Sequence, residues 1–138
     1  IYKEEFIKFS NIGWSNKNIA NHFKKKNNFS IGFFYKDKLC GILIGEKIIN
    51  DKKYDLDIHI MFVSKYFRRN NIGSSILKNI EINKNSNKIT RVYLEVAENN
   101  LGALRFYEKN NFVFLKFRHN YYKNNNKIIN AKCYTKLI

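Results

Sequence analysis

The chain has 138 residues, of which 44% are hydrophobic and 16% aromatic. This content is enough for one folded core, so we expect a single domain over residues 1–138 rather than a disordered segment. The two cysteines, Cys40 and Cys133, are too few and too far apart for a zinc cluster, a disulfide framework or a CxxC redox motif. We expect both to be buried free thiols in a reducing, cytoplasmic setting. No apolar run reaches the roughly 20 residues of a membrane-spanning helix, and the charged start IYKEEFIKFS is unlike a secretory leader.

The charge is strongly positive, with 26 Lys and Arg against 11 Asp and Glu and a formal net charge of +15 at pH 7. The lysines are scattered in short Lys/Asn tracts over residues 24–28, 83–88 and 123–127. A compositional bias produces such scattered tracts, whereas a nucleic-acid-binding protein concentrates its charge on one face or arm. We therefore expect no direct nucleic-acid partner, and, since no apolar run is long enough to span a bilayer, no membrane partner. The positive field still favours phosphate-rich ligands.

Two helical patterns open the chain. Tyr2, Phe6 and Phe9 have the spacing of an amphipathic helix that ends near residues 11–13. Ser15 is a suitable cap for a second helix. The inner face of that helix would consist of Ile19, Ala20 and Phe23.

The pattern then changes to strands, interrupted by two helices. Strands are predicted over residues 29–35, 38–49, 54–63, 91–96, 112–122 and 130–137, with a turn at Lys36-Asp37 and a loop over 123–127. Helices are predicted over residues 72–82 and 101–109. The resulting order, ααβββαβαββ, predicts an α+β fold, an α/β sandwich with a central sheet flanked by helices.

The turn after the strand 54–63 has the composition of a phosphate-binding site. A buried strand ends at Val63, the basic pair Arg68-Arg69 follows, and a helix begins near Ile72. The first amides of a helix lack partners within the helix, and the helix dipole adds positive charge there, so a pyrophosphate is a natural ligand. Gly73 would let the main chain approach that ligand closely.

Two motifs together resemble the GCN5-related N-acetyltransferase (GNAT) superfamily. Its acetyl-CoA signature is Arg or Gln, two residues, Gly, one residue, then Gly or Ala, and Arg68, Asn71 and Gly73 occupy it. Its later signature reads roughly LEV…N..A..FYEK.GF. That pattern is matched by Glu95, Asn100, Ala103, Phe106, Tyr107, Glu108, Lys109 and Phe112. The resemblance covers nearly the whole chain and implies a GNAT fold with a mixed sheet, with acetyl-CoA as cosubstrate and no metal.

The chain departs from the family pattern at three places. Asn71 and Asn111 stand where the family has glycine. Asparagine is the residue after glycine that best tolerates a left-handed main chain, so we expect both turns to be kept. The family's first strand should precede the first helix, and we expect it to be missing or trimmed.

The end of the sequence resembles one branch of the superfamily, the RimI-like ribosomal-protein-alanine acetyltransferases. The segment Arg118-His119-Asn120-Tyr121-Tyr122, a loop and Asn130-Ala131 are similar to that branch, and Gly13-Trp14-Ser15 resembles its Pro-Trp-Ser. The resemblance implies that the acceptor is the N-terminal α-amine of a protein, such as a ribosomal protein. Trp14, Tyr121 and Tyr122 would line the groove for that peptide.

The resemblance also implies roles for individual residues. Glu95 would be the general base, directly or through a water, and Tyr107 the general acid that protonates the departing thiolate. Asp57 and His59 on the preceding strand remain alternative bases. The expected cofactor contacts are the main chain of Phe62 and Val63 for the pantetheine arm, Arg68, Arg69, Asn70, Asn71, Ile72, Gly73 and Ser74 for the pyrophosphate, and Asn100 with Tyr107 for the rest of CoA.

Two other functions remain open from the sequence. The first is a GNAT that acetylates a lysine side chain or a small amine. The second is a basic RNA- or ribosome-binding module that has kept the scaffold but lost catalysis. Such a module would have no reason to retain both Glu95 and Tyr107, so their presence favours an enzyme.

Overall fold

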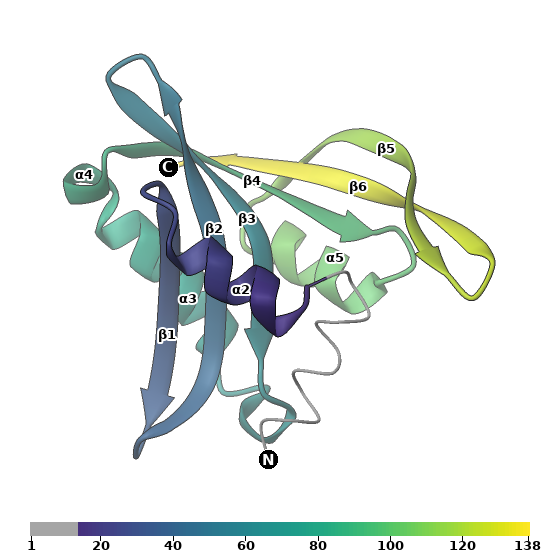
Figure 1. Cartoon of the computed structure of the whole chain (residues 1–138), viewed down its shortest axis with the longest axis horizontal. Helices are drawn as coiled ribbons and strands as arrows, with labels where there is room; N and C mark the ends of the chain where they lie inside the picture. The colour runs from purple at the N-terminus through teal and green to yellow at the C-terminus, as the bar shows by residue number, and fades with distance from the viewer. Residues whose placement is uncertain (1–13) are drawn as a thin grey trace.

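The computed structural model describes residues 14–138. The expectations of a helix over residues 2–9 and of a missing or trimmed first strand concern a part of the chain outside the described residues. Six strands form one sheet in the order β1-β2-β3-β4-β6-β5 (Figure 1). The strands are β1 (Asn28–Tyr35), β2 (Lys38–Asn50), β3 (Lys53–Val63), β4 (Ile89–Ala97), β5 (Val113–Asn124) and β6 (Lys127–Leu137). The helices are α2 (Asn16–Phe23), α3 (Ile72–Ile82), α4 (Lys84–Asn87) and α5 (Leu101–Lys109), with a 3-10 turn η1 at Lys65–Phe67.

The sheet is mixed, as expected. β3 and β4 run parallel, and the other neighbouring pairs among the described strands are antiparallel. The parallel pair is connected through α3, so that helix covers one face of the sheet. None of the helices described between residues 14 and 138 combines the length and apolarity needed to cross a membrane.

Helices cover both faces of the sheet (Figure 1). α3 and α5 pack on one face, where Ile76 of α3 and Leu104 of α5 join the main core with Leu56 and Leu94 from the strands. α2 packs on the other face, where Ile19 contacts Ile44 and Ile60. The prediction of a sandwich is therefore confirmed.

The boundaries of α2 agree with the sequence, but its inner face does not. Ser15 caps the helix by accepting from the Asn18 amide at 3.2 Å, as predicted. The buried residues are Ile19 and His22, whereas Phe23 is 45% exposed. The prediction of Ala20 and Phe23 on the inner face was wrong, because a three-residue step from Ile19 leads to His22, which finds a polar partner in the sheet.

The last two strands are longer than predicted, because two asparagines form a tighter turn between them. The predicted loop over residues 123–127 is a two-residue turn, Asn125-Asn126, with φ values of 46° and 62°. Both residues adopt left-handed conformations that suit a tight hairpin, so β5 and β6 extend to Asn124 and from Lys127. The turn at Lys36-Asp37 is confirmed, with φ values of 45° and 61°. The sequence did not predict α4.

Two irregularities in β3 create the space for a site. The register between β2 and β3 shifts after Ile44–Ile60 to Gly45–Ile58, so His59 is an extra residue that forms a bulge. The ladder between β3 and β4 ends at Ile58 and Leu94. Since β3 continues to Val63 and β4 to Ala97, the two strands separate beyond that pair.

Candidate active site

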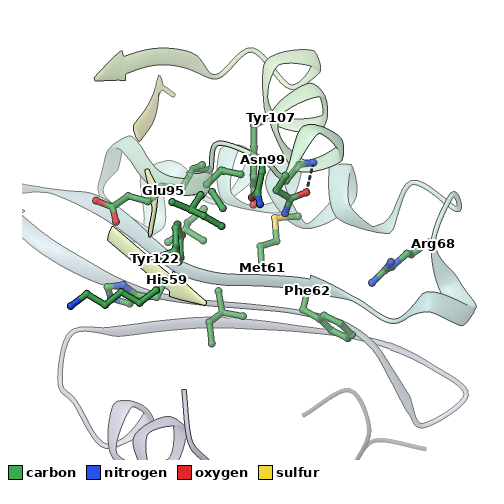
Figure 2. Close-up of a pocket in the computed structure, with 17 residues that line it drawn as sticks. His59, Met61, Phe62, Arg68, Glu95, Asn99, Tyr107 and Tyr122 are labelled. Atoms are coloured by element: carbon green, nitrogen blue, oxygen red, sulfur yellow. Dashed lines mark hydrogen bonds between the residues drawn. The ribbon is translucent and has the colours of Figure 1, made fainter. Parts of the chain in front are cut away.

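Two adjoining cavities lie where β3 and β4 separate. One, of about 490 Å³, is bounded by the turn before α3 and by α5, and the other, of about 420 Å³, extends toward β5 and β6. Both are lined by Met61, Phe62, Arg68, Asn100, Ala103 and Tyr107. Figure 2 shows the second cavity, with Arg68 and Glu95 on opposite sides and Met61 and Tyr107 between them. We call the first the phosphate-side cavity and the second the Glu95 cavity.

The turn at the phosphate-side cavity has the left-handed main chain that the sequence predicted. Asn71 has φ 56° and ψ 13° and stands directly before the first residue of α3. Arg69 has φ 62°, and Asn111 at the other substituted glycine has φ 66°. The Arg68 Nε donates to the carbonyl oxygen of Val63 at 3.0 Å, which ties the turn to the end of β3. Asparagine therefore replaces glycine here without loss of the turn geometry.

Gly73 has a packing role that the sequence did not reveal. A Cβ at this position would lie 3.0 Å and 3.2 Å from two ring atoms of Phe106 and 3.4 Å from the Met61 methyl. The missing side chain therefore lets the start of α3 approach α5. Gly73 still lines the phosphate-side cavity, so it serves packing and access together.

Glu95 lies on β4 at the Glu95 cavity and is held by a salt bridge. The Arg118 Nη1 donates to both carboxylate oxygens, at 3.0 Å and 3.1 Å. The Cys133 thiol, on the neighbouring strand β6, lies 3.7 Å from Glu95 Oε1. The hydrogen bond between Arg118 and Glu95 raises the pKa of Arg118. Glu95 is thus a partly buried carboxylate with a cation as its immediate neighbour.

Tyr107 enters from α5 and lines both cavities. The residue is 8% exposed and packs edge-on against Phe106 and Phe112, with ring centroids 5.2 Å and 5.5 Å away. Burial raises the pKa of Tyr107 well above its ordinary value, and Tyr122 adds to the effect. The phenol is therefore protonated at neutral pH, which is the state that a hydrogen-bond donor requires.

The aromatic residues predicted for the acceptor are only partly brought together. Tyr122 lines the Glu95 cavity, and burial raises its pKa to about 12. Tyr121 packs against Tyr122 with ring centroids 4.8 Å apart, and the Arg118 guanidinium lies 4.0 Å above its ring. Trp14 is not among the residues that line either cavity. It lies instead against His59, which lines the Glu95 cavity, with ring centroids 5.7 Å apart.

The two alternative bases differ in their position. His59, on the bulge of β3, lines the Glu95 cavity, whereas Asp57 does not. Burial raises the pKa of Asp57; His59 opposes this effect, and the carboxylates of Glu95 and Glu46 add to it. Asp57 is thus costly to ionise, which is a property of many catalytic carboxylates and also of carboxylates with no catalytic role.

A comparison with protein families decides the identity. A family model described as "Acetyltransferase (GNAT) family" matches residues 1–112, most of the chain. The chain belongs to the GNAT acetyltransferase family. As a GNAT protein it is an N-acetyltransferase with acetyl-CoA as its cosubstrate. No curated protein matches its sequence.

Solved structures share the GNAT fold at low sequence identity. The ribosomal-protein-S18-alanine N-acetyltransferase from Escherichia coli has a TM-score of 0.76 at 21% identity, over 91% of this chain and 77% of that one. Ard1 from Thermoplasma volcanium has a TM-score of 0.78 at 22% identity, over 91% and 80%. Arabidopsis thaliana NAA60 in complex with a bisubstrate analogue has a TM-score of 0.77 at 16% identity, over 98% and 91%. At these identities the similarity establishes the fold.

Most of the residues expected to hold the GNAT cosubstrate surround the cavities. The phosphate-side cavity is lined by Phe62, Val63, Arg68, Arg69, Asn71, Ile72, Gly73, Ser74, Asn100 and Tyr107. Asn70 is not among them, because its side chain donates to the carbonyl oxygens of Phe67 and Arg68. Two arginines and the first turn of an 11-residue helix border the cavity, so these groups could hold the pyrophosphate of acetyl-CoA.

Several residues at these GNAT cavities were not predicted from the sequence. Met61, Asn99, Phe106 and Lys109 line one or both cavities, and Arg118 pairs with Glu95. Lys109 lies in the matched FYEK segment and Arg118 in the matched segment before Tyr121, so the resemblance already contained both. Met61 reaches the cavities because the bulge at His59 turns it toward α3 and α5, and the sequence carries no signal for that bulge.

Proposed function

We propose that this N-acetyltransferase acetylates the N-terminal α-amine of a protein, such as a ribosomal protein, in the cytoplasm. The observation that carries the proposal is that Glu95 of β4, Tyr107 of α5 and Tyr122 of β5 line the same cavity. The first two supply a proton acceptor and a proton donor, and the third supplies an aromatic wall. The fold is shared with an Escherichia coli enzyme that is named for its action on ribosomal-protein-S18 alanine.

In this proposal each residue has a separate task. Acetyl-CoA supplies an acetyl group activated as a thioester. The first turn of α3 with Arg68 and Arg69 holds the pyrophosphate. Glu95 accepts the proton of the acceptor amine, directly or through a water, and Tyr107 donates its hydroxyl proton to the departing sulfur. The raised pKa of Tyr107 keeps the phenol protonated at neutral pH, so its hydroxyl is available as a hydrogen-bond donor to the sulfur.

The chemistry of the amine favours an α-amine acceptor. An α-amino group has an ordinary pKa near 8, whereas lysine has one near 10.4. At neutral pH a larger fraction of the α-amine than of a lysine amine is already neutral. Glu95, although paired with Arg118, therefore has to deprotonate a smaller fraction of the acceptor. An extended N-terminal peptide can also stack on Tyr122 and Tyr121, which a lysine side chain alone would do poorly.

The test is a panel of acceptor peptides with acetyl-CoA, analysed by mass spectrometry. Each peptide begins with Ala and contains an internal lysine, and a matched peptide has its α-amine blocked. We expect acetylation at the α-amine and no turnover of the blocked peptide. Equal turnover of blocked peptides or of free polyamines would instead establish the lysine or small-amine acceptor. Acetyl-CoA binding without transfer to any acceptor would favour the non-catalytic module.

A variant at the aromatic wall links the acceptor to this cavity. Tyr122→Ala should raise KM for the peptide more than KM for acetyl-CoA, because the ring lines the Glu95 cavity and not the phosphate-side cavity. Phe34→Ala is the matched control, since Phe34 lies on β1 with 64% of its surface exposed and lines neither cavity. A larger effect on KM for acetyl-CoA would contradict the proposed peptide groove.

A further inference from the structure

Three residues with metal-binding side chains meet on the sheet face that α2 covers. His22 lies in the last turn of α2, Glu46 on β2 and His59 on the bulge of β3. One possible ligand atom from each lies within 4.8 Å of the other two. Glu46 is opposite Asp57 in the β2–β3 register, so their side chains lie on the same face of the sheet. His59 contacts both carboxylates and therefore lies on that face too, which His22 of α2 faces.

The hydrogen bond of His22 leaves one ring nitrogen available. The Nε2 atom lies 2.9 Å from the carbonyl oxygen of Gly45, and the residue is 3% exposed. A carbonyl oxygen only accepts, so Nε2 carries the proton and Nδ1 keeps a lone pair in the neutral ring. Metal-bound histidines are typically held in this way, with the second nitrogen donating to a backbone carbonyl or a carboxylate.

His59 and Glu46 complete the cluster. The His59 Nε2 is 3.5 Å from Glu46 Oε2, and its Nδ1 is 3.9 Å from Asp57 Oδ2. Asp57 is thus near the nitrogen that faces away from Glu46, as an orienting carboxylate would be. Glu46 Oε2 is at present paired with the Lys25 ammonium at 3.1 Å, but the Lys25 side chain is 50% exposed and can return to solvent.

Trp14 lies beside both imidazoles. Its ring centroid is 5.5 Å from that of His22 and 5.7 Å from that of His59, and the two histidine rings are 5.4 Å apart. The indole thus covers one side of the two imidazoles, while the His59 and Glu46 side chains keep 28% and 24% of their surface exposed.

We propose that His22, Glu46 and His59 form a binding site for Zn²⁺, with a water as the fourth ligand. Two imidazoles and one carboxylate are a donor set that zinc accepts, whereas Mg²⁺ and Ca²⁺ take oxygen ligands. The ion displaces Lys25 from Glu46 and connects α2 to β2 and β3. It lies next to the Glu95 cavity, which His59 also lines, but it takes no part in the proposed acetyl transfer.

The site can be tested by metal titration of the untagged protein. We expect one equivalent of Zn²⁺ by calorimetry, a rise in Tm with Zn²⁺ but not with Mg²⁺, and visible absorption bands of a four-coordinate ion with Co²⁺. His59→Gln and Glu46→Gln should each weaken Zn²⁺ binding by at least the roughly 10- to 100-fold that loss of an outer partner causes. His119→Gln is the matched control, because His119 lies on β5 beside Phe117 and is not a member of the cluster. No binding, or binding that survives both substitutions in folded protein, would overturn the proposal.

The competing lysine offers a test in the opposite direction. Lys25→Met removes the cation that occupies Glu46 and should tighten Zn²⁺ binding several-fold, on the scale of a partly exposed ion pair. Lys24→Met removes the same charge from the preceding residue, which is also exposed, and should change the affinity for Zn²⁺ less. Equal effects of the two substitutions would mean that zinc responds only to the net charge of the protein, and would overturn the proposed role of Glu46.

Discussion

At the scale of single residues, the carboxylate of Glu95 is held in place by a neighbour from another strand. Arg118 of β5 holds both of its carboxylate oxygens, and the Arg118 side chain is 54% exposed. An exposed arginine can move away at little cost, since surface ion pairs contribute roughly 0–1 kcal/mol. We infer that an acceptor amine reaches Glu95 by displacing the guanidinium or through a bridging water.

Kinetics can separate the two proposed catalytic residues from the cosubstrate site. Glu95→Gln keeps the shape of the side chain but removes the proton acceptor, and Tyr107→Phe keeps the buried ring but removes the donor. Each should lower kcat by the roughly 10²–10⁴-fold that is typical of acid–base groups, with little change in acetyl-CoA affinity. A nearly unchanged kcat for Glu95→Gln would move the base to Asp57, His59 or a chain of waters.

Asp57 provides a prediction of stability against pH. Its raised pKa means that the folded protein keeps this proton to higher pH than the unfolded chain does, so ionising Asp57 costs stability. The cost is fully present above the folded-state pKa. Asp57→Asn should therefore raise Tm at neutral pH, and the gain should shrink toward zero as the pH falls to 3.8, the ordinary pKa of this carboxyl.

The control for Asp57 is an exposed aspartate. Asp37→Asn in the β1–β2 turn keeps a residue that tolerates φ 61°, and it should change Tm little at any pH. A loss of stability for Asp57→Asn at neutral pH would show that its attraction to His59 outweighs the cost of burial.

At the scale of elements, the contact between α3 and α5 determines the shape of the phosphate-side cavity. Gly73 at the start of α3 faces the ring of Phe106 on α5 so closely that an added Cβ would lie 3.0 Å from its nearest ring atom. The turn that precedes it has left-handed residues at Arg69 and Asn71. These features bring the basic turn and α5 to the two sides of one cavity.

A double substitution tests this packing role. Gly73→Val should weaken acetyl-CoA binding roughly tenfold, or about 1.4 kcal/mol, because the added side chain displaces Phe106 and Met61 from their positions at the cavity. In a Phe106→Leu background the same substitution should cost less, because the smaller side chain makes room for the new one. Calorimetric titration with CoA measures both. An equal loss in the two backgrounds would mean that the added side chain obstructs the ligand directly.

At the scale of the whole molecule, the site depends on the point where a continuous sheet divides. β3 pairs with β4 as far as Ile58 and Leu94. Beyond that pair the two strands diverge, and the cavities lie between them. α3 and α5 close one side, and the β5–β6 hairpin extends beside the other (Figure 1). A ligand here contacts elements from both halves of the sheet, so its binding should stabilise the protein as a unit.

Hydrogen exchange with and without acetyl-CoA tests this description. We expect slower exchange at residues 60–63, 71–75 and 100–104, which border the cavities, and a Tm that rises with ligand concentration. The β2–β3 turn at residues 51–52 lies at the opposite end of β3 from residues 60–63 (Figure 1) and should exchange at the same rate in both states. Protection confined to another surface would contradict the proposed binding site.

The sequence by itself determined the family and most of the elements, although not α4. Periodicity of apolar residues placed α3 and α5 at the residues observed, and turn residues such as Asn71 and Asp37 marked where the chain bends, because these signals act between residues close in the chain. The motifs around Arg68 and Tyr107 contained most residues of the cavities.

Only the tertiary structure decided which of these residues act on one another. The bulge at His59 turns Met61 toward the cavities, Arg118 reaches Glu95 across 23 residues of sequence, and His22 is buried because Gly45 offers it an acceptor. Each of these depends on strand register and on the packing of a helix against a distant strand. Such contacts follow from the fold as a whole, and local periodicity contains no information about them.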